Sequence, residues 1–121
     1  YANDRQFVQV YRQYDDFLRK NNLCDFDDLI LLPFILFKSY PDSLPRYQRQ
    51  FRWISVDEYQ DVNDAQYQFL KLLTGEVINL CVIGDPDQAI YGFRGANREY
   101  FLRFHQDFPN ARTIRLNRNY R

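Results

Sequence analysis

Acidic residues follow two apolar runs of the chain, where they could take part in phosphate chemistry. The run at 53–57 ends in Asp57, and Glu58 comes next. A second run, at 78–83, is followed closely by Asp85. If both runs are parallel strands, their carboxyl ends share one edge of a sheet, which is where ligands bind. Clustered carboxylates repel unless a cation joins them, and Mg²⁺ prefers one or two carboxylates plus phosphate oxygens. The pattern therefore predicts a crevice in which adjacent residues hold the metal and activate water.

A purely local role is the alternative for these carboxylates. Aspartate often caps the turn that follows a strand by hydrogen bonding to the backbone. Taken singly, Asp57 and Asp85 fit that role as well as a functional one. Two acidic strand ends on one edge favour the shared site.

The loop at 84–96 carries groups that could bind a single-stranded nucleic acid. Tyr91 and Phe93 are too large for an ordinary exposed turn. Bases stack on aromatic rings at roughly 1–3 kcal/mol each, and Arg94 suits a phosphate. Gln88 is closer in sequence to the acidic crevice and could hydrogen bond a terminal phosphate. The alternative is that the two rings fill core, because 18% of the residues are aromatic.

The elements that must position these groups follow from the apolar spacing. Apolar side chains recur every three or four residues through 4–21 and again after Asp25, which predicts two helices, the second kinked or ended at Pro33. Further along, the sequence predicts a strand at 53–57, a helix capped by Asn63 and ended by Gly75, a strand at 78–83, a helix capped by Asn97 and a strand at 113–116. Alternating strands and helices indicate an α/β fold with a parallel sheet and right-handed crossovers.

The composition indicates a single domain without a disulfide or metal signature. The chain has 121 residues, 45% of them hydrophobic, which suffices for a modest core. Cys24 and Cys81 lie in apolar runs, so we expect reduced core thiols and no zinc site. His105, the only histidine, is expected to be solvated. The sixteen basic and sixteen acidic residues cancel, so bulk charge gives no argument for a nucleic-acid partner.

Targeting signals are not evident in the sequence. No apolar run has the length of a membrane span, and the first residues lack the layout of a secretory signal. We therefore expect a cytoplasmic protein without a membrane partner. The chain contains no methionine and begins at Tyr1, so we expect it to be a piece of a larger protein.

Three motifs, in this order, resemble those of the UvrD/Rep-type superfamily 1 DNA helicases. They are VDEYQD at 56–61, GDPDQAIYGFRGA at 84–96 and LNRNYR at 116–121. FDDLILL at 26–32 is also similar to the segment by which that family's chain returns into its first RecA-like domain. The resemblance implies a partial RecA-like (P-loop NTPase type) parallel sheet flanked by helices. Residues 1–22 would be a helical lead-in, and residues 23–121 the C-terminal part of the first RecA-like ATPase domain.

The resemblance also implies roles at the nucleotide. Asp57 is similar to the residue that holds the magnesium of Mg-ATP, and Glu58 to the base that orients the attacking water. Gln60 matches a supporting position of the nucleotide site. Gln88 resembles the glutamine that senses the terminal phosphate and couples it to DNA.

The resemblance also implies roles for residues that would contact DNA and for the last residues of the chain. Tyr91, Phe93 and Arg94 match the part of the loop that meets single-stranded DNA, although the family often has tryptophan where Phe93 stands. Tyr120 resembles the tyrosine that stacks on adenine. Arg121 resembles the arginine that reaches the terminal phosphate, and such an arginine contributes roughly 10³–10⁵ in rate.

The function implied is that of an ATP-dependent DNA helicase motor. Such a motor couples Mg-ATP hydrolysis to translocation on single-stranded DNA, generally 3′ to 5′, and to duplex unwinding in repair or replication. The phosphate-cradling pattern GxxxxGK[ST] is absent, since Lys38-Ser39 follows Phe37 without a glycine. In the family that segment lies upstream and a second RecA-like domain lies downstream. We therefore expect the chain alone neither to bind ATP tightly nor to hydrolyse it.

Two alternatives share parts of this pattern. The motor of a recombination helicase-nuclease carries the same motifs. A non-catalytic nucleotide or single-strand binding module would keep the fold but lose catalytic positions, and the intact Asp57, Glu58, Gln88 and Arg121 count against it.

Overall fold

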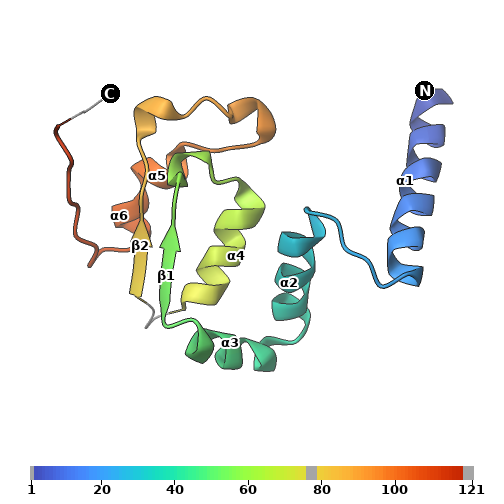
Figure 1. Ribbon diagram of the computed structural model, residues 1–121, viewed down its shortest axis with the longest axis horizontal. Helices are drawn as coiled ribbons and strands as arrows, with labels where there is room; N and C mark the ends of the chain where they lie inside the picture. Colours follow the sequence, from blue (N-terminus) through green and yellow to red (C-terminus); the bar gives the residue numbers. More distant parts are fainter. Residues whose placement is uncertain (1, 76–78, 119–121) are drawn as a thin grey trace.

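The computed structural model describes residues 2–75 and 79–118, and it contains a two-stranded parallel sheet (Figure 1). The strands are β1 (Trp53–Val56) and β2 (Asn79–Val82). The helices within the described ranges are α1 (Ala2–Lys20), α2 (Asp28–Ser39), α3 (Leu44–Gln50), α4 (Asp64–Thr74), α5 (Glu99–Leu102) and α6 (Phe104–Asp107). Short 3₁₀ turns lie at Pro41–Ser43, Tyr59–Asp61, Pro86–Gln88 and Gly92–Arg94.

The sheet confirms the parallel pairing predicted from the sequence, with a core on one face. Trp53 pairs with Asn79 and Val56 with Val82, so the two strands end together. Alternate side chains of both strands, Ile54, Val56, Leu80 and Val82, pack on the core. Their neighbours face away, and Trp53 remains 80% exposed. The fold is thus mixed α/β.

The expectation of core cysteines is wrong. Cys81 lies on the outward face of β2, which the described residues leave uncovered, and it is exposed. Cys24 lies in the connection between α1 and α2 and is also exposed. An apolar run predicts a strand buried on both faces, whereas this strand is covered on only one.

Helix α4 begins and ends where the sequence predicts. The Asn63 side chain accepts a hydrogen bond from the Gln66 backbone N–H at 2.9 Å, and the Gln66 side chain accepts one from the Asn63 N–H at 3.1 Å. This reciprocal pair is a capping box, which satisfies two otherwise unpaired N–H groups. Gly75 closes the helix with a φ of +51°, a conformation that disfavours residues with a side chain.

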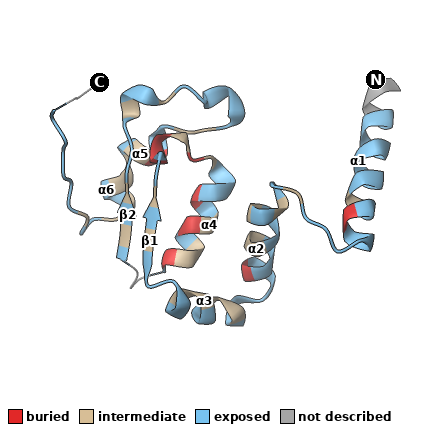
Figure 2. Ribbon diagram, in the orientation of Figure 1, coloured by how far each residue is buried: buried red, intermediate tan, exposed pale blue. Residues whose placement is uncertain are grey.

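Aromatic side chains form most of the core between α4, α5 and the sheet. Figure 2 marks the buried residues along α4. The buried members are Tyr59, Val62, Tyr67, Leu70 and Tyr100. Tyr67 and Tyr100 stack with their ring centroids 4.0 Å apart, and the Arg103 guanidinium lies over both rings. The Tyr100 hydroxyl donates to Asp64 at the start of α4. These contacts hold α5 and α6 against α4.

The N-terminal half of the chain is helical, as expected, and most of its described residues are exposed. In Figure 1, α1 lies at one side of the molecule, beyond α2. Asp25 and Asp28 each accept a hydrogen bond from the other's backbone N–H, at 2.9 and 3.3 Å. Asp25 thus contacts the first residue of α2, but the N-cap position is Asp27, two residues later than predicted. The Asp28 N–H is the main cause that lowers the pKa of Asp25. Pro33 does not end this helix, which continues to Ser39.

Two predictions about the last third of the chain are wrong. Residues 113–116 form no strand; instead they are exposed, and the His105 ring nitrogen contacts the Thr113 hydroxyl at 2.6 Å. A β-branched sequence favours extended backbone, but a strand also needs a neighbouring edge, and this contact holds the segment near α6 instead. The helix after Asn97 is divided at Arg103 into α5 and α6. No helix among the described residues is long and apolar enough to cross a membrane.

Replacing Tyr59 by phenylalanine is expected to stabilise the chain. The ring is fully buried, and its hydroxyl has no hydrogen-bond partner among the described residues. An unpaired buried hydroxyl costs about 1–3 kcal/mol, which the phenylalanine removes. Burial raises the pKa of Tyr59 from 10.0 to about 12. The folded state therefore resists ionisation that the unfolded state allows, so the wild type loses stability as pH rises from about 10 to about 12.

Urea unfolding followed by circular dichroism measures this effect. The free energy of unfolding of Tyr59→Phe should exceed that of the wild type at about pH 7, and the gap should widen above about pH 10. Tyr40→Phe is the matched control, because Tyr40 is 66% exposed. A Tyr59→Phe variant less stable than the wild type at neutral pH contradicts the assignment of an unpaired hydroxyl.

Candidate functional site

The carboxyl edge of the sheet brings together the two segments that the sequence singled out. Because β1 and β2 are parallel and end together, the chain leaves both strands at this edge. The Ile83 N–H donates to the Val56 carbonyl at 2.8 Å, and the Tyr59 N–H donates to the Ile83 carbonyl at 2.9 Å. These bonds extend the pairing beyond the strands. They fix residues 57–60 next to the start of the loop at 84–96.

Asp57 and Glu58 turn sharply out of β1. Asp57 Oδ1 accepts a hydrogen bond from the Glu58 N–H at 2.9 Å. Glu58 has φ 51° and ψ 41°, in the left-handed region that costs a residue with a side chain roughly 1–2 kcal/mol. Strained residues of this kind concentrate at functional sites. Both side chains are exposed and so are accessible to a ligand.

Gln60 lies behind these carboxylates and is 1% exposed. Its Nε2 donates to Glu58 Oε2 at 2.6 Å, and its Oε1 accepts from the Asp85 N–H at 3.0 Å. A single side chain thus joins the end of β1 to the residues that follow β2.

The Asp85 side chain is hydrogen bonded within its own loop. Its Oδ1 accepts from the Asp87 N–H at 3.0 Å, and its Oδ2 accepts from Gln88 Nε2 at 2.9 Å. The bond from Gln88, with that from Asp87, lowers the pKa of the Asp85 carboxyl. The local capping role therefore describes the Asp85 side chain, and within the described part of the chain Asp57, Glu58 and Asp85 do not form a group of three carboxylates that could hold a metal. Asp85 instead holds Gln88 at the mouth of the loop.

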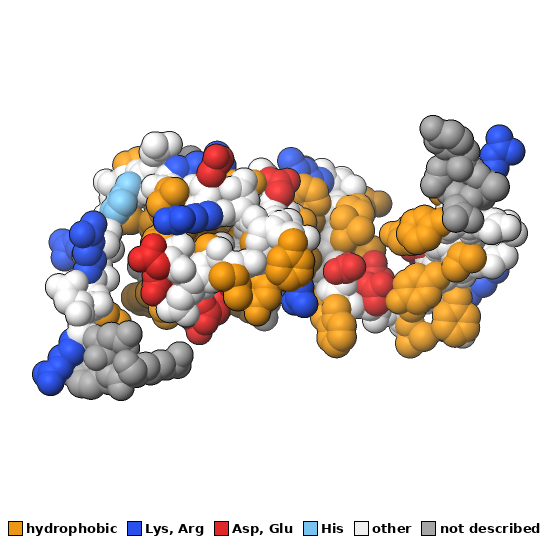
Figure 3. Space-filling view, turned by 90° about the horizontal axis from the view of Figure 1, so that it is seen from above, with side chains coloured by type: hydrophobic (Ala, Val, Ile, Leu, Met, Phe, Trp, Pro, Cys, Tyr) orange, Lys and Arg blue, Asp and Glu red, His pale blue; other side chains and the backbone are white. Residues whose placement is uncertain are grey.

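An open pocket of about 450 Å³ lies beside β1, between α2 and α4. Its acidic lining residues are Asp57, Glu58 and Asp61, and its apolar ones include Ile30, Val56 and Phe69. Seen from above in Figure 3, acidic and basic side chains are interspersed over the body of the molecule, and hydrophobic ones gather over α1. The acidic residues after β1 therefore border a space that a ligand could enter.

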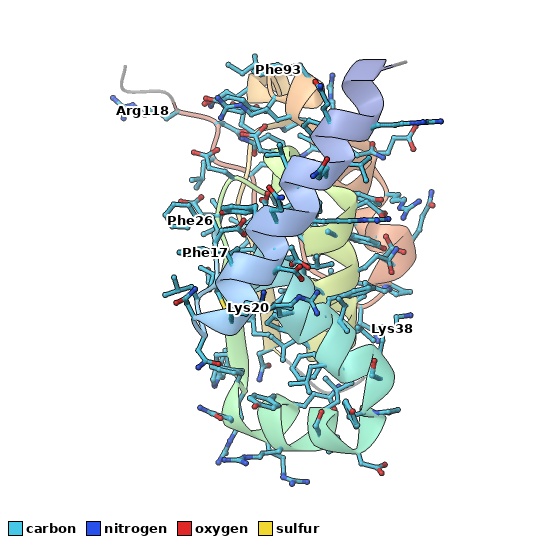
Figure 4. The ribbon with its side chains drawn as sticks, turned by 90° about the vertical axis from the view of Figure 1, so that its right-hand side faces the viewer. Phe17, Lys20, Phe26, Lys38, Phe93 and Arg118 are labelled. Atoms are coloured by element: carbon cyan, nitrogen blue, oxygen red, sulfur yellow. The ribbon has the colours of Figure 1, made fainter. Side chains whose placement is uncertain are left out.

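The loop at 84–96 presents two aromatic rings and an arginine. Phe93 is 79% exposed and Tyr91 38% exposed, so the alternative that both rings fill core is not supported within this chain. The ring centroids are 6.0 Å apart, and the Arg94 guanidinium lies 5.2 Å from the Tyr91 ring and 5.4 Å from the Phe93 ring. Figure 4 places Phe93 at the upper end of the molecule.

The far end of this loop is tied back to the start of α4. The Asn97 N–H donates to the Val62 carbonyl at 3.1 Å, and Asn63 forms an antiparallel bridge with Ala96. Gly95 adopts a φ of +84°, which lets the chain reverse there. The aromatic tip is therefore held at both ends of the loop.

The side chains at this edge of the sheet show whether it could bind Mg²⁺. No group of three or more His, Cys, Asp or Glu side chains that could hold a metal occurs within 2–75 and 79–118. Asp57 offers an exposed carboxylate, and Mg²⁺ commonly takes one or two carboxylates plus phosphate oxygens and water. The residues thus fit a metal that arrives with a phosphate ligand, not a resident one.

Tyr120 and Arg121, assigned to the nucleotide by resemblance, lie outside the described residues. The structure does place Asp57, Glu58, Gln60 and Gln88 in one hydrogen-bonded region. Tyr91, Phe93 and Arg94 form a separate cluster further along the same loop.

The sequence does not indicate that Gln60 is buried. A glutamine in a polar turn is ordinarily exposed, so its type gives no signal. Gly84, which leaves space for the amide, is the one sequence feature that could have indicated it.

The sequence of this chain is similar to those of known proteins. Residues 1–109 match the family model described as the UvrD/REP helicase N-terminal domain. The chain is 53% identical over 114 residues to a protein of Leuconostoc citreum named ATP-dependent DNA helicase PcrA, covering 94% of this chain and 15% of that protein. Proteins of the same name from Staphylococcus epidermidis and Staphylococcus aureus are 49% and 51% identical, over 99% and 98% of this chain and 17% and 16% of theirs.

The family match and these identities define the class of this α/β chain, which has carboxylates and a glutamine at the edge of a parallel sheet. The chain belongs to the UvrD/REP helicase N-terminal domain family. It spans about a sixth of the length of these relatives.

Proposed function

We propose that this chain is part of the first RecA-like domain of an ATP-dependent DNA helicase motor. Residues 1–22 would form the helical lead-in, and residues 23–121 the C-terminal part of that domain. Membership of the helicase family and the parallel pairing of β1 with β2 support this proposal. The observation that carries it is the Glu58–Gln60–Asp85–Gln88 hydrogen-bond chain, which joins the predicted hydrolytic carboxylate to the predicted phosphate sensor.

On the nucleotide side, Asp57 would hold the Mg²⁺ of Mg-ATP, which when bound neutralises charge on the phosphate oxygens. Glu58 would orient the attacking water and accept its proton, because its carboxylate is exposed yet fixed by the Gln60 amide. Gln88 would donate to the terminal phosphate in place of its present bond to Asp85. Tyr120 and Arg121 would complete the site at the adenine and at the terminal phosphate.

On the DNA side, Tyr91 and Phe93 would stack on bases, and Arg94 would contact a phosphate. The exposure of Phe93 and the position of Arg94 over both rings support this role. Gln88 lies between this cluster and the carboxylates in sequence, so the loop would link nucleotide state to the grip on DNA. The full-length protein would use this link to translocate 3′ to 5′ on single-stranded DNA and separate duplexes in repair or replication.

The test is ATP turnover by the full-length protein with and without single-stranded DNA. We expect magnesium-dependent hydrolysis that DNA stimulates, and displacement of a duplex strand when a 3′ single-stranded tail is supplied. Hydrolysis indifferent to DNA would favour a motor with another substrate. Binding of DNA and ATP without hydrolysis would favour the non-catalytic module.

A further inference from the structure

Gln60 is the least exposed polar side chain of the described residues, although it lies in the turn after a strand. Burying an amide without hydrogen-bond partners is costly, so a buried one is expected to have specific partners. Gln60 has a partner at each end of its amide, Glu58 and Asp85, and these belong to different strand ends.

The orientation of the Gln60 amide is fixed by its partners. The carboxylate of Glu58 only accepts hydrogen bonds, so it requires the NH₂ group. The backbone N–H of Asp85 only donates, so it requires the carbonyl oxygen. If the amide were flipped, its oxygen would face the Glu58 carboxylate and its NH₂ group would face the Asp85 N–H, so neither hydrogen bond could form.

Packing around the amide leaves it little freedom. A Cβ built on Gly84 would lie 2.5 Å from Gln60 Oε1 and 3.0 Å from Phe101 Cε2. It would also lie 3.2 Å from the Tyr59 backbone nitrogen. The absence of a side chain at Gly84 is therefore what leaves room for the amide between the two strand ends.

One interpretation is that Gln60 only stabilises the turn. The bond to Glu58 satisfies the buried NH₂ group, but it also holds an exposed carboxylate that the turn itself does not require. The short 2.6 Å contact restrains the carboxylate, and the strained backbone of Glu58 aims it. Restraint of a reacting group to one geometry is a recognised source of rate.

Resting on the proposed function, we infer that Gln60 is a positioning residue for hydrolysis and not a nucleotide-binding one. It holds the Glu58 carboxylate in the orientation that accepts a proton from water, and it fixes that orientation relative to the backbone of Asp85. Because Asp85 accepts a hydrogen bond from Gln88 in this structure, the same side chain links the hydrolytic carboxylate to the phosphate sensor before Gln88 turns to the phosphate.

Two substitutions in the full-length protein test the two hydrogen bonds of the Gln60 side chain. Gln60→Met keeps the length of the side chain and removes both bonds. Gln60→Glu keeps the acceptor for the Asp85 N–H but replaces the donor to Glu58 with a like charge. We expect both to lower kcat for DNA-stimulated ATP hydrolysis on the order of 10²-fold, with KM for ATP and Kd for single-stranded DNA unchanged.

Single-turnover hydrolysis in a Glu58→Gln background gives the sharper readout. If Gln60 acts through Glu58, adding Gln60→Met should cause no further loss of rate, because coupled residues are not additive. A full additional loss, or a rise in KM for ATP without a change in kcat, overturns the inference. A wild-type kcat in either single variant also overturns it.

The controls separate this inference from the proposed function. The thermal unfolding midpoint of each variant is measured, and Gln60→Met, which buries no charge, decides the outcome if Gln60→Glu is unstable. If Glu58→Gln itself leaves hydrolysis intact, the proposed role of Glu58 as the base fails, and the inference fails with it. If Glu58→Gln abolishes hydrolysis while the Gln60 variants do not reduce it, only the inference fails.

Discussion

Replacing Glu58 by glutamine in the full-length protein is expected to lower the rate of ATP hydrolysis by about 10²–10⁴-fold, the usual contribution of a general base. Binding of ATP and of single-stranded DNA should stay unchanged. Glutamine has nearly the same shape as glutamate, and so it should occupy the same position beside Gln60. It cannot accept a proton from water, which is the step assigned to the carboxylate.

The geometry around Glu58 makes this substitution selective. Its Oε2 accepts from Gln60 at 2.6 Å, and an amide oxygen placed there can accept the same bond. Asp57, the proposed metal ligand, is bonded to the backbone N–H of Glu58 and not to its side chain, so that contact survives. Nucleotide binding and hydrolysis should therefore separate.

Steady-state ATP hydrolysis and equilibrium binding of a fluorescent nucleotide measure the two effects. Glu99→Gln is the matched control, since it makes the same chemical change at an exposed residue of α5. We expect that control to behave as the wild type. Retention of hydrolysis by Glu58→Gln removes the role of Glu58 as the base, and loss of ATP binding together with hydrolysis indicates a structural role instead.

The elements with a complete local signal were predictable from the sequence. Asn63 and Gly75 mark the two ends of α4. Both ends could be predicted, because capping and a positive φ depend on the residue itself and its near neighbours. The parallel pairing of β1 and β2 followed from the helix between them, since a short crossover of this kind joins parallel strands.

Features that depend on distant neighbours were not predictable in this way. Residues 113–116 have the composition of a strand, but pairing also needs an adjacent edge, and Thr113 instead contacts His105. Cys81 has apolar neighbours in sequence, yet it points to the uncovered face of β2. Local sequence sets backbone preference and alternation, but not which face the rest of the molecule covers.

The candidate site shows the same division. Asp57 and Glu58 could be placed at the sheet edge from the apolar run before them. The hydrogen bond between the Gln60 side chain and the Asp85 backbone could not be predicted in this way, because it joins residues 25 positions apart and requires Gly84 to lack a side chain. The Asp85 carboxylate was expected to join the others, and the nearer donors on Asp87 and Gln88 satisfy it first.

Replacing Phe93 by alanine in the full-length protein is expected to weaken binding of single-stranded DNA by about 5- to 150-fold, equivalent to the roughly 1–3 kcal/mol of one stacked base. Phe93 is 79% exposed and lies 6.0 Å from Tyr91, so its ring is available to a base without rearrangement of the core. For the same reason, the unfolding midpoint should change little. The stimulation of ATP hydrolysis by DNA should require correspondingly more DNA.

Two further substitutions decide whether the ring acts by stacking. Phe93→Leu keeps an apolar side chain but removes the π face, and it should lose nearly as much affinity as alanine. Phe93→Trp enlarges the stacking surface and should bind at least as tightly as the wild type. Fluorescence anisotropy with a labelled oligonucleotide at fixed salt measures all three. If Phe93→Leu binds like the wild type, the residue supplies only apolar contact, and the grip on DNA must come from Tyr91 and Arg94, whose guanidinium lies 5.2 Å from the Tyr91 ring.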